Sequence, residues 1–166
     1  MKWVMMAILL VLLQVDAHQT VFNLEMQESD VQRIEDAMQL ASQDAVLNVA
    51  SSDTTNGTAP VFNQTQALSA FDATLAANLD LDPTTLQPVP GTMLSVAPQM
   101  VYDQFIDGSN ATFPVSYSNA TYGIGPLTLE QPTFVVAVKF TVPGYALDMS
   151  PVTLTVPMVQ SYQYAQ

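Results

Sequence analysis

The side chains that most often carry nucleophilic or metal chemistry are scarce in this sequence. It holds one histidine, His18, and no cysteine, so a Ser–His–Asp or Cys–His arrangement and a zinc site both lack essential parts. Cleavage after Ala17 would make His18 an N-terminal residue of the kind that some copper sites use, but those sites require a second histidine. The sequence therefore predicts no catalytic residue, no metal site, no cofactor and no enzymatic activity.

Carboxylates and amides are the remaining candidates for ion binding. Asp80 and Asp82 flank one leucine, and Asp103, Asp107 and Asn110 lie in one short stretch, so either set offers oxygen ligands of the type that Ca²⁺ prefers. Neither set has the spacing of a dedicated calcium loop. We therefore expect these residues to serve turns and helix ends. No glycine-rich phosphate loop is present either.

Four Asn-x-Thr sequons form the clearest modification motif, and they begin at Asn56, Asn63, Asn110 and Asn119. This is more than the asparagine and threonine content would produce by chance. All four lie in polar segments that follow the N-terminal helix predicted below. N-linked glycans there would cover a surface that carries few charges. The alternative is that threonine-rich loops contain these sequons by accident, and that the cell has no transferase to use them.

The charge balance restricts the partners of the chain. Three basic residues face 15 acidic ones, which gives a net charge of -12, and only 11% of residues are charged, against about 25% in ordinary soluble proteins. Such a chain cannot neutralise a phosphate backbone, so the sequence excludes nucleic-acid binding. Low charge and high acidity fit a secreted protein that does without disulfides, although a lack of cysteine is compatible with any redox compartment. We expect an extracellular, cell-surface location, and the alternative is an ordinary acidic soluble protein.

Helix-breaking residues are distributed unevenly along the chain. All 6 glycines and all 11 prolines follow residue 56. A stripe at spacings of three and four, which includes Ile34, Met38 and Ala41, predicts one helix over residues 2–51. At ~1.5 Å per residue it would extend about 75 Å, so part of it must protrude. The expected division is a helix over 1–52, amphipathic over 20–50, and a β-rich head over 53–166.

Residues 3–13 are apolar on every side of the predicted helix, so they must be buried in something. Residues 1–17 have the form of a cleaved signal peptide, in which Lys2 precedes the apolar run and Ala17 lies at the cleavage site. As a membrane anchor the run is short, because the hydrocarbon core needs about 20 apolar residues. A third role is a retained assembly helix that packs against copies of itself. We favour this role because the helical pattern continues beyond Ala17.

The expected assembly segment covers residues 3–15, with contacts from Lys2, Trp3, Ile8, Leu9, Leu12 and Asp16. A carboxylate among apolar helices is costly unless it is paired. The hypothesis is that Asp16 pairs with Lys2 or the terminal amine of a neighbour and sets the axial register. The alternative places Asp16 at the water boundary where the apolar run ends.

The remaining chain is expected to form one short helix and several strands. Apolar spacing predicts a helix over residues 65–79. Strand character follows over 100–106, 113–117, 133–142 and 152–164. The third of these is almost continuously apolar and should be central, whereas Pro157 favours an edge position for the last. We therefore predict an α+β fold in which the short helix packs on an antiparallel sheet.

An apolar helix of residues 3–15 that projects from a small β-rich head resembles the pilins. The segment Phe22-Asn23-Leu24-Glu25 has no preceding glycine, so the prepilin-peptidase motif is absent. The resemblance implies a structural subunit of an extracellular filament made of many identical copies, in contact with the membrane only before assembly. The alternative function is a secreted or membrane-anchored binding module on the cell surface, with residues 1–17 as signal or anchor.

Overall fold

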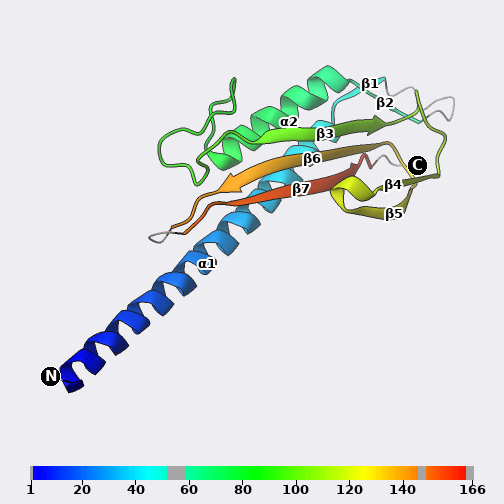
Figure 1. Cartoon of the computed structure of the whole chain (residues 1–166). Coiled ribbons are helices and arrows are strands. Elements are labelled where there is room, and N and C mark those ends of the chain that lie inside the picture. Colours follow the sequence, from blue (N-terminus) through cyan, green and yellow to red (C-terminus); the bar gives the residue numbers. More distant parts are fainter. Residues whose placement is uncertain (1, 52–58, 146–148, 164–166) are drawn as a thin grey trace.

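The computed structural model describes residues 2–51, 59–145 and 149–163. It begins with one long helix, α1 (Lys2–Val46). The N-terminal half of α1 extends away from the rest of the molecule, and its C-terminal half packs against the sheet and the second helix (Figure 1). We call residues 2–22 the protruding segment, residues 23–46 the packed segment, and the described residues from 49 onward the head. The expectation of a long helix that projects from the folded body is confirmed.

The helix ends earlier than residue 51, so the predicted end was wrong. The Asn48 side chain donates to the carbonyl of Asp44 at 2.9 Å and caps the last turn. The chain then enters strand β1 (Val49–Ser51), which pairs with β2 (Val61–Phe62). Neither glycine nor proline marks this end, and the break is made by tertiary strand pairing. The expected boundary between residues 52 and 53 lies outside the described residues.

Helix α2 (Gln64–Leu79) begins one residue before the predicted start and ends at the predicted residue. Asn63 caps its N-terminus, where the side chain accepts a hydrogen bond from the backbone N–H of Gln66. At the C-terminus, Asp80 adopts the left-handed conformation, and its N–H donates to the carbonyl of Ala76. Local sequence therefore defines both ends of this helix.

The main sheet has three antiparallel strands in the order β3-β6-β7, namely β3 (Gln99–Ile106), β6 (Thr133–Val142) and β7 (Val152–Ser161). The central position of β6 and the edge position of β7 are both confirmed. Pro157 fits an edge strand because it cannot donate a ladder hydrogen bond. Strand β7 ends before residue 164, which lies outside the described residues.

A second, two-stranded sheet follows β3 along the chain. Strand β4 (Val115–Asn119) begins two residues after its predicted start and continues two residues beyond the predicted end. It leads through a 3-10 turn, η2 (Ala120–Tyr122), into β5 (Ile124–Leu129). The sequence analysis missed β5 because Gly125 and Pro126 lie inside it, and both residues argue against a strand interior.

The main sheet buries both faces, which explains why β6 is almost continuously apolar. On its inner face, side chains of β6 pack against α1 and α2, and the rings of Phe134 and Phe71 meet edge to face at 5.8 Å. On its outer face, Val135 packs with Ile124 and Leu129 of the β4–β5 hairpin. The result is the predicted α+β fold, with helices on one face of an antiparallel sheet (Figure 1).

Candidate functional site: the protruding helix

The protruding segment is the largest apolar surface of the described chain. Every side chain over residues 2–18 is exposed, including Trp3 at 80% and Leu12 at 61%. Burial of one large apolar side chain contributes about 1.5–3 kcal/mol, so covering residues 3–13 would contribute on the order of 20 kcal/mol per chain. Exposed patches of this size mark an interaction surface. Within the described chain, nothing covers these side chains.

Its dimensions also match a lipid bilayer. An 18-residue window of α1 near the N-terminus has a mean hydropathy of 1.6, and none of it is buried. At ~1.5 Å per residue, residues 2–22 extend about 30 Å, close to the thickness of the hydrocarbon core. A signal sequence has the same features, so hydropathy and length do not distinguish a signal, an anchor and an assembly helix.

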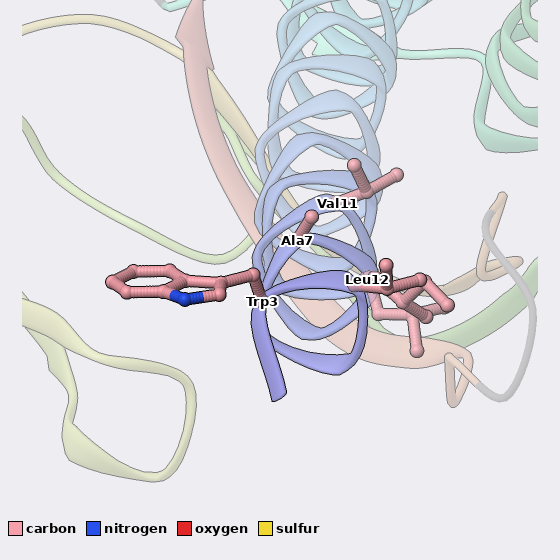
Figure 2. Close-up of a pocket in the computed structure, with 6 residues that line it drawn as sticks. Trp3, Ala7, Val11 and Leu12 are labelled. Carbon is pink, nitrogen blue, oxygen red and sulfur yellow. The ribbon is translucent and has the colours of Figure 1, made fainter. Parts of the chain in front are cut away.

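One face of the protruding segment is hollowed. Figure 2 shows Trp3 and Leu12 directed to opposite sides of this face, with the smaller Ala7 and Val11 between them. The small alanine leaves a shallow notch with apolar walls, which are completed by Val4 and Ile8. Small residues allow a second helix to approach closely, and this gain in contact does not depend on water. The notch thus has the shape to receive an apolar side chain of another helix.

The two charged residues of the segment, Lys2 and Asp16, are both exposed. They are separated by about four turns, so they lie on the same side of α1. At ~3.6 residues per turn, Ala7 and Val11 lie on the opposite side. Thr20 donates to the backbone carbonyl of Asp16 at 3.0 Å, and the Asp16 carboxylate has no ion pair within the described chain. The pairing of Asp16 with a neighbour stays a prediction.

A polar clamp fixes α1 to the head at the point where the protruding segment ends. The Asn23 side chain accepts the backbone N–H of Tyr145 at 2.7 Å, and Gln27 donates to the carbonyl of Pro143 at 3.2 Å. The Tyr145 hydroxyl donates to the carboxylate of Asp30. Because these bonds join the β6–β7 connection to successive turns of α1, they hold the helix at a defined angle to the head.

Burial favours the protonated form of the Tyr145 hydroxyl, which is the form that donates a hydrogen bond in this clamp. Asn23 and Asp30 are both buried, although neither is apolar. Burial, together with the hydrogen bond to the Asp30 carboxylate and the charge of that carboxylate, raises the pKa of Tyr145 to about 12. The phenol therefore stays protonated at neutral pH and remains a donor to Asp30.

The sequence analysis did not single out these clamp residues. Asn23, Gln27 and Asp30 are spaced by four and three residues, and the next step of four reaches the buried Ile34. They thus continue the buried stripe of the packed segment toward the N-terminus. Apolar periodicity does not reveal this extension, because its side chains are polar.

The aspartates weighed as calcium ligands have structural contacts instead. The Asp80 carboxylate forms an ion pair with Arg33 of α1 at 2.7 Å. Asp82 accepts the backbone N–H groups of Thr84 and Thr85, and the bonds from Thr85 lower the pKa of its carboxyl group most. These contacts agree with the expected roles at helix ends and turns.

Asp107 and Asn110 organise the turn after β3. The buried Asp107 carboxylate accepts the N–H of Phe62 at 3.0 Å and that of Ser109 at 2.9 Å. Asn110 accepts the N–H of Asp107 and donates to the carbonyl of Phe105. Within the described chain, no group of at least three His, Cys, Asp or Glu side chains is arranged to hold a metal ion.

Three of the four sequons fall within described residues. Asn110 is exposed, and Asn63 and Asn119 are half-buried. The amide nitrogen of Asn110, to which a glycan would attach, donates to Phe105, so this side chain is the most constrained of the three. Asn56 lies outside the described residues. N-linked glycosylation stays a prediction for all four.

The arrangement thus combines a head with a buried core, a polar clamp and an exposed apolar helix. Comparisons of the chain with models of protein families, with curated proteins and with solved structures found no match.

Proposed function

We propose that this chain is a structural subunit of an extracellular pilus-like filament. The observation that carries the proposal is that α1 is one continuous helix whose protruding segment leaves all of its apolar side chains exposed. In the filament, protruding segments of many copies pack together in the centre, and the heads form a polar outer layer. Non-closing head-to-tail packing yields an open fibre and needs no catalytic residue.

The continuity of α1 supports retention of residues 1–17. The helix passes through Ala17 and His18 without a break and is fixed to the head at Asn23. If the apolar run is retained, the clamp sets the direction in which this run projects from the head. If residues 1–17 are removed, the clamp has no such run to orient.

The notch between Trp3 and Leu12 supports a helix as the partner of the segment. Lipid chains adapt to any apolar surface, whereas a notch with an alanine floor favours a complementary side chain. Ile8 and Leu9 from a neighbouring copy are of suitable size. Before assembly, the same segment would lie in the membrane, where its length fits the hydrocarbon core.

The alternative is a secreted or membrane-anchored binding module. The mean hydropathy of 1.6 over an 18-residue window near the N-terminus is consistent with it, because an anchor or a signal has the same property. In that case residues 1–17 are removed or stay in the membrane, and the head acts alone.

Surface material from native cells separates the two functions. We expect shear to release filaments that are visible by electron microscopy, and peptide mapping of their subunit to recover residues 3–13. A mature protein that begins at His18 would overturn the filament proposal and favour the secreted module. A full-length chain that stays monomeric after detergent removal would also overturn it.

A further inference from the structure

We propose that neighbouring heads bind one another face to edge, with Lys139 of one copy seated in the groove between α1 and β7 of the next. This inference rests on the proposed filament and deepens it by naming a contact between heads. It follows from the position of one cation, the lining of one groove and the fact that the cation lies on the outer face of the main sheet whereas the groove lies at its edge.

Lys139 lies in an uncharged part of the outer sheet face. Residues on β6 alternate between the two faces, and the neighbours Val138 and Phe140 point to the helices, so Lys139 points outward. It pairs in register with Gln99 on β3 and Thr155 on β7, and all three side chains are exposed. The β4–β5 hairpin covers the other end of this face, around Val135. A flat polar surface with one central cation remains open.

The receiving groove runs between α1 and the edge strand β7. Its walls combine carboxylates and an amide of α1 with apolar side chains of β7, and it is lined by Glu35, Asp36, Gln39, Leu154, Thr155, Val156, Pro157 and Met158. A lysine suits such a groove, because its aliphatic stem can lie along apolar side chains while the ammonium reaches carboxylates. The outer edge of β7 has no strand partner within the described chain, so its free backbone groups can bond to neighbouring polar side chains.

The charge inventory supports this pairing. The chain has three basic residues, and Arg33 is already paired with Asp80 in its own chain. Lys2 belongs to the protruding segment, so Lys139 is the cation that remains for contacts between heads. Glu35 and Asp36 are exposed and form no ion pair within the described chain. Heads with a large net negative charge repel each other unless such a cation meets an acidic surface.

The positions of the two surfaces predict the symmetry of the contact. The groove lies where the helix layer meets the edge of the main sheet, because its lining combines residues of α1 with residues from both faces of the edge strand β7. Lys139 lies on the outer face of the central strand β6. A contact from outer face to edge uses two different surfaces, which makes it heterologous and able to repeat without closing. The packing of the heads is then consistent with the open packing proposed for the protruding segments.

Charge substitution tests the contact in the full-length chain, with the critical concentration for assembly as the readout. We expect Lys139→Glu to raise that concentration about tenfold, which corresponds to about 1.4 kcal/mol. Glu35→Lys alone should also raise the critical concentration, because Lys139 of one copy would then face a second positive charge at position 35 of the next. The double variant Lys139→Glu, Glu35→Lys restores the opposite charges, so we expect it to assemble within about threefold of the wild type.

A matched control separates the specific contact from overall charge. Lys139→Gln and Gln87→Glu each make the net charge more negative by one, and Gln87 is exposed on the connection between α2 and β3. We expect Lys139→Gln to impair assembly more than Gln87→Glu does. Equal effects of these two variants, or no rescue in the double variant, would overturn the contact while wild-type filaments still support the proposed function. Failure of the wild type to assemble would refute both.

Discussion

The two halves of α1 share one backbone but have opposite surroundings. In the packed segment, Ile34, Met38 and Ala41 are fully buried along one stripe, and polar residues cover the other sides. In the protruding segment, apolar side chains lie on every side, and all of residues 2–18 are exposed. The apolar stripe of the packed segment is buried against its own head. Within the described chain, nothing buries the apolar side chains of the protruding segment, so only other molecules could cover them.

This contrast shows what the clamp contributes. Asn23, Gln27 and Asp30 lie between an apolar stripe that binds the head and an apolar run that does not. Without hydrogen bonds at this point, the continuous helix α1 could tilt relative to the head. Directional polar contacts limit this tilt because they require a defined geometry, whereas apolar contacts are non-directional.

The largest expected effect comes from placing a charge in the protruding segment. Ile8→Glu should abolish assembly, because a carboxylate buried among apolar helices costs several kcal/mol. The control Gln32→Glu adds the same charge to an exposed position of the packed segment and should assemble normally. Both variants should melt like the wild type in mild detergent. Filaments of normal yield from Ile8→Glu would show that this segment is not the assembly core.

A second pair of variants compares the packed and protruding segments of α1 directly. Met38 is 0% exposed and Leu9 is 59% exposed. We expect Met38→Ala to lower the free energy of unfolding by about 2–5 kcal/mol. Leu9→Ala should change it by less than about 0.5 kcal/mol. Urea unfolding of both variants in mild detergent checks this. A large loss of stability in Leu9→Ala would mean that the protruding segment packs on the head.

The parts of the fold that sequence predicted are those set by local pattern. Apolar periodicity predicted α2 to within one residue, and continuous apolar content identified β6 as the central strand. The parts that it missed depend on contacts between distant residues. The end of α1 at Val46 and the existence of β5 both follow from strand pairing that no local signal marks. In the candidate site, the apolar run was evident, but Tyr145 could not be connected to Asp30 without the fold.

The register hypothesis gives the third prediction. If Asp16 of one copy pairs with Lys2 of the next, Asp16→Ala should cost about 1.5–3 kcal/mol per contact. We expect lower filament yield and an altered axial rise, measured by electron microscopy. Asp44→Ala removes an acidic residue near the far end of α1 and should leave the rise unchanged. If Asp16→Ala filaments keep both yield and symmetry, Asp16 simply marks the water boundary.

The smallest effect concerns the clamp and its dependence on pH. Tyr145→Phe removes the hydrogen bond to Asp30 and should cost about 1 kcal/mol. An unfolded tyrosine loses its proton near pH 10, whereas the pKa of folded Tyr145 is raised to about 12 by burial and by Asp30. Between these values the folded state binds more protons, so its stability is intact below about pH 10 and falls as pH rises toward 12.

Urea midpoints measured from about pH 8 to pH 12 report this fall. We expect Tyr145→Phe to weaken the dependence of the urea midpoint on pH but not to remove it, because burial also raises the pKa of Tyr117 to about 12. Tyr122→Phe is the control, since the Tyr122 hydroxyl donates to the carbonyl of Val101 and not to a carboxylate. If Tyr145→Phe and the wild type lose stability in parallel, the bond between Tyr145 and Asp30 does not hold α1 to the head.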